Sequence, residues 1–244
     1  MEPGLIEAMH AAESTHWWFR ARRRILLSIL NDELPKGARL LDVGCGTGYF
    51  LEAAQEYWDV YGLDFAEEAV AFCRSRGLTN VRQTSVQALA DLEGGSFDCV
   101  SFCDVIEHLD DDVGALGAAG RLLRPGGLCL VTVPAYQWLW SPRDDAHDHR
   151  RRYTRASLTR TILDAGLQSE FVTYFNSYLF PLAVVSRLIE RVFKLTGSEQ
   201  VHAPPGPINN LFERIFRHER HRLVGKPRRG FKAGLSVLAI ATLK

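Results

Sequence analysis

The sequence predicts an α/β fold in which helices cover a mainly parallel sheet. Apolar runs typical of buried strands, at 40–43, 60–63, 97–103 and 128–133, alternate with segments of helical pattern. Such alternation favours parallel strands joined by right-handed crossovers. The first run ends in a turn, 44–48, with glycine at every second position. Because glycine accepts positive φ and has no Cβ, this turn lets the backbone approach a nucleotide-like ligand closely.

Residues 1–35 precede the sheet and are expected to form a helical cap, because apolar side chains recur at helical spacing through 5–33. The sheet is expected within a ligand-binding core, 36–175. In its later part a helix is predicted at 155–165, and a sixth strand follows at 167–174.

An insertion, 176–231, separates the sixth strand from a last strand expected in 232–244. Its first part, 179–195, is an amphipathic helix with apolar residues on one face and basic residues on the other. The proline-rich stretch 202–207 is expected to be non-helical. A second, basic helix is predicted at 210–223.

Two interpretations of this insertion stay open. It is either a helical cap packed on the sheet, or a lid or interfacial membrane contact through 178–231, because basic residues flank an apolar face. No apolar run of the sequence suggests a membrane span, and no signal peptide is visible. The expected location is therefore cytoplasmic, with peripheral membrane association as an open alternative.

Composition narrows the class of protein. The 244 residues suit one domain, and the formal net charge of zero argues against a nucleic-acid partner. The 5 cysteines are odd in number, and several fall in predicted core strands, so they are expected to be reduced. The sequence leaves the oligomeric state open.

Four ordered motifs carry a resemblance to a known family. They are LLDVGCGTG at 40–48, GLD at 62–64, FDCVSFCDVIEHL at 97–109 and LLRPGGLCLVTVP at 122–134. Together they resemble class I S-adenosylmethionine-dependent methyltransferases. The resemblance implies a Rossmann-like, seven-stranded, mostly parallel sheet flanked by helices, here with a C-terminal helical insertion. It also implies S-adenosyl-L-methionine as the cofactor.

Several cofactor contacts follow from this resemblance. Asp64 ends the second strand, where an acid can hold the ribose hydroxyls, and Phe65 would pack on the adenine. Asp42 and the carbonyl of Cys103 would lie near the cofactor's ammonium group.

Two further contacts depart from the family pattern or rest on position alone. Ser85 stands where many relatives carry an acid that accepts from the adenine amino group, and the backbone of Val86 is an alternative partner. Arg24 lies at a position similar to an arginine that meets the cofactor carboxylate in ubiquinone-pathway relatives. The expected cofactor-binding residues are Arg24, Asp42, Gly44, Cys45, Gly46, Gly48, Asp64, Phe65, Ser85, Val86 and Cys103.

The acceptor side centres on a short segment after the fourth strand. In a helix, Asp104, Glu107 and His108 would share one face, as a divalent-metal half-site or a general-base cluster. The segment resembles ubiquinone-pathway O-methyltransferases, and also small-RNA 2′-O-methyltransferases, in which such a motif and a downstream histidine hold Mg²⁺. His149 is the candidate downstream partner. Metal-free catalysis by Glu107, His108 and His149, binding of Mg²⁺ by these three with Asp104, and a structural role remain open.

The predicted function is O-methylation of a small, partly apolar molecule, such as a quinone precursor, a lipid-linked sugar or a natural product. A hydroxyl acceptor needs a base or a cation to remove its proton, and the histidine cluster offers either. Aromatic residues in 134–142 and 17–19 would make the acceptor pocket large and apolar. The alternatives are a metal-dependent RNA ribose 2′-O-methyltransferase and a non-catalytic cofactor-binding scaffold.

Overall fold

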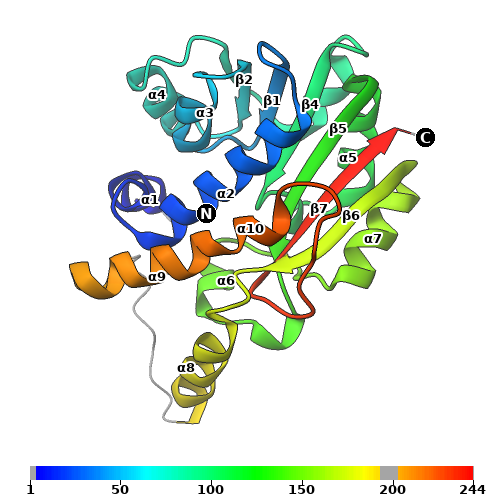
Figure 1. Cartoon of the computed structure of the whole chain (residues 1–244). Coiled ribbons are helices and arrows are strands. Elements are labelled where there is room, and N and C mark those ends of the chain that lie inside the picture. Colours follow the sequence, from blue (N-terminus) through cyan, green and yellow to red (C-terminus); the bar gives the residue numbers. More distant parts are fainter. Residues whose placement is uncertain (1–3, 193–202, 244) are drawn as a thin grey trace.

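The computed structural model describes residues 4–192 and 203–243, and within them it shows one seven-stranded sheet with helices on both faces (Figure 1). The strands are β1 (Arg39–Val43), β2 (Asp59–Asp64), β3 (Val81–Gln83), β4 (Phe97–Cys103), β5 (Leu123–Pro134), β6 (Leu167–Phe175) and β7 (Ser236–Leu243). Their order is β3-β2-β1-β4-β5-β7-β6, and only β7 runs antiparallel to its neighbours β5 and β6. The predicted Rossmann-like, mostly parallel sheet is confirmed.

The helices form two layers. The α-helices are α1 (Leu5–Glu13), α2 (Trp17–Glu33), α3 (Tyr49–Ala54), α4 (Glu67–Ser75), α5 (Asp112–Leu122), α6 (Pro142–Ala146), α7 (Arg155–Asp164), α8 (Phe180–Val192), α9 (Gly206–His218) and α10 (Arg220–Leu223). Short 3₁₀ helices are η1 (Val86–Asp91), η2 (Ile106–His108) and η3 (Gln137–Leu139). Helix α2 crosses in front of the sheet with α9 and α10 against it, and α5 and α7 pack together on the other face (Figure 1).

The central strands are buried on both faces, which explains their continuous apolar character. In β4, Cys99 through Phe102 are all buried, and the same holds for Cys129 through Val133 in β5. All 5 cysteines are free, and Cys103 alone among them is half-buried rather than buried. They behave as small apolar core residues, as predicted.

Two element boundaries differ from the sequence-based expectation. Strand β5 begins at Leu123, before the Arg-Pro-Gly-Gly segment, with an irregular register against β4. Helix α9 begins at Gly206 instead of 210, because proline is tolerated in the first turn of a helix, where its missing N–H is not needed. Residues 193–195 of the predicted helix and His202 lie outside the described residues.

The second half of the insertion packs on the N-terminal helices. Phe216 of α9 is fully buried against Trp17 and Phe175, with ring centroids 6.0 and 5.7 Å away. The side-chain oxygen of Asn209 accepts a hydrogen bond of 2.9 Å from the Trp17 N–H, which satisfies a donor at the start of α2. Helix α9 is therefore a structural cover for α2.

The first half of the insertion is anchored at its beginning. Buried Glu219, between α9 and α10, accepts hydrogen bonds from the N–H groups of Ser177 (2.6 Å) and Tyr178 (2.9 Å) just before α8. Beyond this anchor, α8 presents an exposed set of large apolar side chains, called here the α8 apolar face: Leu182, Val185, Leu188 and Ile189. None of the helices described is both long and apolar enough to cross a membrane.

Candidate active site

The glycine turn, residues 44–48, leaves β1 with three positive φ angles: 69° at Gly44, 54° at Gly46 and 80° at Gly48. A Cβ at Gly44 would lie 2.6 Å from Val105 Cγ2, and one at Gly48 would lie 2.6 Å from Leu78 Cδ1. A Cβ at Gly46 would meet nothing within 4 Å. Gly44 and Gly48 are therefore needed for close packing, whereas Gly46 faces open space that a ligand can approach.

Asp64, at the end of β2, reaches back to this turn. Its Oδ2 accepts from the Gly46 N–H at 2.8 Å and its Oδ1 from the Ala66 N–H at 2.9 Å, while burial raises its pKa. Phe65, the next residue, is 64% exposed, so its ring is free to stack on a planar group. This geometry suits the predicted roles of both residues.

The third strand brings the remaining predicted adenine contacts to the same place. The Thr84 N–H donates to the Asp64 carbonyl at 2.8 Å, and Ser85 follows directly before η1. Ser85 is exposed and Val86 is half-buried. Both therefore lie beside Asp64, at the edge where the ribose is expected.

Asp42 is buried inside the sheet rather than open to a ligand pocket. Ser101, its register partner on β4, donates to Asp42 Oδ1 at 2.6 Å, and burial raises the Asp42 pKa to about 7. This serine is a partner that sequence reasoning did not identify. Cys45, the other turn residue predicted in the site, is also buried, with its sulfur 3.9 Å from the sulfur of Cys73.

The structure brings Arg22, not Arg24, to the strand ends. Arg24 pairs with Glu213 of α9, as Arg20 does on the same face of α2. Arg22 lies on another face and donates from Nη2 to Thr132 Oγ1 at 2.8 Å. Its buried Nε has no hydrogen-bond partner among the described residues.

Asp104 is the partner of Arg22 in this position. It lies 2.9 Å from Arg22 Nη2, accepts from Thr132 Oγ1 at 3.1 Å, and has a φ of 61°. The expectation that it shares a helical face with Glu107 and His108 is wrong, because η2 is a three-residue 3₁₀ helix that begins only at Ile106. The left-handed backbone at Asp104 turns its carboxylate toward Arg22 instead.

Glu107, His108 and His149, called here the Glu-His-His cluster, do meet. Ligand atoms of all three lie within 4.8 Å of one another, and the two imidazole centroids are 4.8 Å apart. The Arg150 N–H donates to the Glu107 carbonyl at 2.8 Å and its Nε to the His108 carbonyl at 2.8 Å, which ties the segment after α6 to η2.

The cluster is electrostatically unusual. Glu107 is fully buried, and neither of its carboxylate oxygens has a hydrogen-bond partner within 4–192 and 203–243. Burial raises its pKa well above the usual range. Burial and neighbouring His149 lower the pKa of His108 to about 4, so its imidazole is neutral at pH 7. Orphaned carboxylate oxygens beside the neutral imidazole of His108 fit an acid–base site or a cation site.

Asp144 orients the second histidine and was not identified from the sequence. Its Oδ1 lies 2.8 Å from His149 Nδ1, and Arg152 Nε donates to the same oxygen at 2.7 Å. Burial opposes ionisation of Asp144, yet the hydrogen bonds from His149 and Arg152 bring its pKa below the usual range. A carboxylate that binds Nδ1 of an imidazole fixes the tautomer of the imidazole, and its Nε2 is then available for proton transfer or for a metal.

The donor set has consequences for the choice of metal. One carboxylate and two imidazoles suit transition metals such as Mn²⁺, Fe²⁺ or Zn²⁺ better than Mg²⁺, which prefers oxygen ligands. Asp104, the fourth predicted ligand, does not belong to this group.

The aromatic residues predicted to line the acceptor pocket differ in exposure. Trp17 packs edge-on against Phe212 of α9 at 5.6 Å, so it belongs to the cover over α2. Tyr136 stacks on Tyr174 at 4.9 Å, whereas Trp138 is 49% exposed.

Comparison with known proteins gives consistent results. A family model described as a methyltransferase domain matches residues 14–170, which is more than half of the chain. The ubiquinone biosynthesis O-methyltransferase of Methylococcus capsulatus is 41% identical over 103 residues, or 40% of this chain and 44% of that protein. The enzyme of the same name from Xanthomonas oryzae pv. oryzae is 36% identical over 138 residues, or 50% of this chain and 58% of that protein. The chain thus spans about half the length of the curated relatives it matches.

Solved structures share the fold at low sequence identity. A SAM-dependent methyltransferase from Archaeoglobus fulgidus superposes with a TM-score of 0.59 at 19% identity, covering 90% of this chain and 93% of that one. A geranyl diphosphate methyltransferase in complex with SAM gives 0.59 at 18% identity, covering 91% and 84%. With the glycine turn and Asp64 at adjacent strand ends, and a methyltransferase-domain match across the core, this chain belongs to the class I S-adenosylmethionine-dependent methyltransferases.

Proposed function

We propose that this protein transfers a methyl group from S-adenosyl-L-methionine to an oxygen atom of a small, partly apolar molecule. The observation that carries the proposal is the Glu-His-His cluster beside the glycine turn. The two sites adjoin because Val105, next to η2, lies against Gly44. A neutral imidazole at this position can accept the proton of a hydroxyl acceptor, which an amine acceptor would not require.

The roles of the chain's own residues follow from their contacts. S-adenosyl-L-methionine, when bound, supplies an electrophilic methyl group on a sulfonium. His108 takes the proton of the acceptor hydroxyl, and His149, held in place by Asp144, packs against the His108 ring. Holding the acceptor oxygen in line with the methyl group in a closed pocket supplies much of the acceleration.

The acceptor class rests on the relatives and on the apolar surroundings. The curated relatives are ubiquinone biosynthesis O-methyltransferases, so a phenolic quinone precursor is the first acceptor to test. A lipid-linked sugar or another natural product has the same chemistry, a hydroxyl on a partly apolar body. The exposed ring of Trp138 suits contact with such a body.

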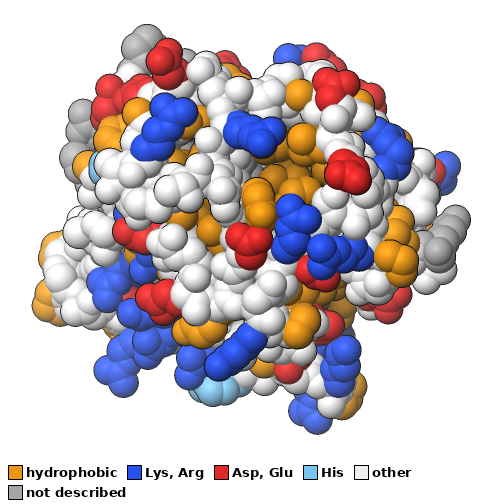
Figure 2. All heavy atoms as spheres, turned by 90° about the horizontal axis from the view of Figure 1, so that it is seen from above, with side chains coloured by type: hydrophobic (Ala, Val, Ile, Leu, Met, Phe, Trp, Pro, Cys, Tyr) orange, Lys and Arg blue, Asp and Glu red, His pale blue; other side chains and the backbone are white. Residues whose placement is uncertain are grey.

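A metal-dependent version of this reaction is supported by the same cluster. A divalent ion held by Glu107, His108 and His149 would lower the pKa of the acceptor hydroxyl in place of a base. Label transferred into RNA in a metal-dependent manner would indicate an RNA ribose 2′-O-methyltransferase instead. The mixture of basic and acidic side chains over much of the face in Figure 2 offers little support for that alternative.

The proposal is tested by incubating the protein with methyl-labelled S-adenosyl-L-methionine and an extract of the source cells. Parallel reactions contain a chelator, Mg²⁺ or Mn²⁺, and products are divided into lipid, aqueous small-molecule, RNA and protein fractions. We expect label in the lipid or small-molecule fraction, stable to conditions that hydrolyse esters. Methyl transfer that is lost with chelator and restored better by Mn²⁺ than by Mg²⁺ would favour the metal-dependent reaction. Cofactor binding without label in any fraction would contradict the proposal and favour the scaffold alternative.

We also propose that the insertion contacts an anionic lipid surface from which a lipid-linked acceptor is taken. The α8 apolar face is exposed, and Arg214, Arg217 and Arg220 on α9 and α10 lie at least partly open to solvent. Exposed apolar side chains near basic ones are typical of interfacial helices.

Replacing Leu188 with Glu is expected to abolish sedimentation with vesicles that contain phosphatidylglycerol, because a charge would enter the acyl region. Leu188 is 52% exposed, so the fold should tolerate the change. The matched control is Leu163→Glu on α7, where a leucine of 45% exposure lies outside the insertion. Equal sedimentation of the two variants, or wild-type protein that remains in the supernatant, would contradict the lipid contact.

A further inference from the structure

We propose that α1 is a latch on the cofactor site, in which Glu13 is the positioning residue that couples docking of α1 to the shape of the glycine turn. The inference rests on the cofactor-binding part of the proposed function. It concerns residues outside the motifs that define the site, because Glu13 lies about thirty residues before the turn.

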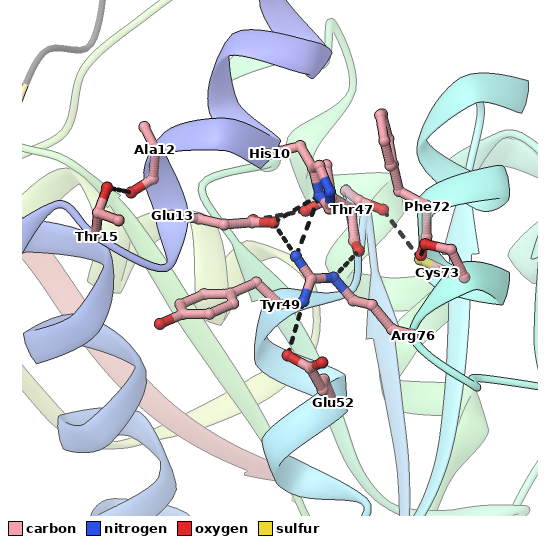
Figure 3. A network of polar contacts seen from close by, with 12 residues as sticks. His10, Ala12, Glu13, Thr15, Thr47, Tyr49, Glu52, Phe72, Cys73 and Arg76 are labelled. Carbon is pink, nitrogen blue, oxygen red and sulfur yellow. Dashed lines mark hydrogen bonds and ion pairs between the residues drawn. The ribbon is translucent and has the colours of Figure 1, made fainter.

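Glu13 is the last residue of α1, and its carboxylate is buried, with only 4% of the residue exposed. One oxygen, Oε2, accepts a hydrogen bond of 2.5 Å from Thr47 Oγ1. The other, Oε1, pairs with the guanidinium of Arg76 (Figure 3). Both carboxylate oxygens are thus engaged, and one of them holds a residue of the glycine turn itself.

Arg76, directly after α4, completes the hold on the turn. Its Nε donates to the Thr47 carbonyl at 2.9 Å and its Nη1 to Glu52 Oε2 at 2.8 Å, and its side chain is only 12% exposed. The side chain of Thr47 is therefore fixed by α1, and its backbone is fixed by α4 (Figure 3).

Thr47 lies between Gly46, which faces the open space that a ligand can approach, and Gly48, which packs against Leu78 and Cys73. Gly46 and Gly48 both have positive φ, and glycine loses more conformational freedom on ordering than other residues. A turn already ordered by Glu13 and Arg76 binds a ligand with a smaller entropy cost. By thermodynamic reciprocity, a ligand that orders the turn strengthens the docking of α1 by the same factor.

Helix α1 depends on its contacts with the rest of the protein. It is 9 residues long and has no side-chain N-cap hydrogen bond, so it is too short to be stable by itself. Besides Glu13, His10 attaches α1 to its surroundings: its ring stacks on Phe72 of α4, with centroids 4.0 Å apart, and its Nδ1 lies 3.1 Å from Arg76 Nη2. Loss of the Glu13 contacts should therefore loosen α1 while the sheet stays folded.

The experiment measures cofactor affinity and α1 protection in Glu13→Gln. Binding of S-adenosyl-L-homocysteine is followed by calorimetry, and hydrogen exchange over residues 5–13 is measured with and without this ligand. We expect affinity to fall about tenfold, since a charge-assisted bond is lost. We also expect the ligand-dependent protection of α1 seen in wild type to be reduced. At saturating cofactor, kcat should change by less than about twofold, because the Glu-His-His cluster is untouched.

A paired substitution separates positioning from general stability. Thr47→Ser keeps the hydroxyl that donates to Glu13, whereas Thr47→Val removes it at nearly constant volume; only the second should reproduce Glu13→Gln. Asp164→Asn, which breaks the exposed Arg160 pair on α7, is the control that should leave affinity unchanged. If Glu13→Gln unfolds, the serine and valine variants decide the outcome.

Three results would overturn the latch. One is unchanged affinity in Glu13→Gln and Thr47→Val, another is α1 protection that does not depend on ligand in wild type, and the third is a fall in kcat with unchanged affinity. Wild-type protein that binds no cofactor would contradict the proposed function and the latch together. Normal binding without any methyl transfer would contradict the proposed function alone, since the latch is measured by binding and exchange.

Discussion

Replacing His108 with Ala is expected to lower methyl transfer at least a hundredfold, roughly the contribution of a well-placed general base. Binding of S-adenosyl-L-methionine should stay within about threefold of wild type, because His108 lies in η2, outside the glycine turn. His149→Ala should give a similar loss, since the two imidazoles are packed together. Single-turnover rates and calorimetric binding of the same preparations measure the two effects separately.

The pH dependence of the wild-type rate provides an independent check. With the His108 pKa lowered to about 4, the base is neutral well below pH 6.5, so the rate should persist into mild acid. The free energy of unfolding, in contrast, falls over this range. Between pH 6.5 and pH 4, His108 binds a proton in the unfolded chain but not in the folded protein, so acid favours unfolding. A rate that falls with an apparent pKa near 6.5 would contradict the assigned environment of His108.

His218→Ala is the control for these substitutions, because His218 is an exposed histidine of α9 outside the cluster. It should leave transfer and binding at the wild-type level. A hundredfold loss in this control, or full transfer in His108→Ala, would remove the Glu-His-His cluster from the mechanism.

Gly46→Ala is expected to weaken cofactor binding more than tenfold while the protein remains folded. The new Cβ would meet no protein atom within 4 Å and would instead occupy the open space that the ligand approaches. The φ of 54° costs a non-glycine residue about 1–2 kcal/mol, which a domain of this size should tolerate. Calorimetric titration and thermal unfolding test the two halves of this expectation.

Gly48→Ala is the matched substitution with the opposite outcome. Its Cβ would lie 2.6 Å from Leu78 Cδ1 and 2.9 Å from Cys73 Sγ, at a φ of 80°. Overpacking and backbone strain together should lower the free energy of unfolding by about 3 kcal/mol or more. Equal destabilisation by the two substitutions, measured in urea, would contradict the distinction between a ligand-facing and a packing glycine.

The cofactor half of the site is readable from the chain because it is local. The glycine turn follows a strand directly, and Asp64 ends the next strand, so parallel pairing of β1 and β2 brings them together without further information. The meeting of His149 with Glu107 follows from similar logic, since both segments leave the carboxyl edge of neighbouring strands.

The choice between Arg22 and Arg24 could not be made in this way. Successive arginines on a helix point about 100° apart, and only the packing of α2 against α9 decides which one meets Glu213 and which one meets Asp104. The same applies to Asp144, whose partners His149 and Arg152 are defined by how the loop after β5 folds back on η2.

By itself, then, the sequence determined the alternation of strands and helices and the glycine turn, because apolar periodicity and glycine spacing act over a few residues. Asp64 and the candidate residues Glu107, His108 and His149 came from motif position and from the resemblance to methyltransferases. The tertiary structure decided that Asp104 pairs with Arg22 instead of lying with Glu107 and His108. It also decided that α9 covers α2, and that Glu13 accepts a hydrogen bond from Thr47, about thirty residues away in the sequence. Those pairings join side chains from separate elements, and their geometry depends on helix phase and on how the layers pack, which local pattern does not specify.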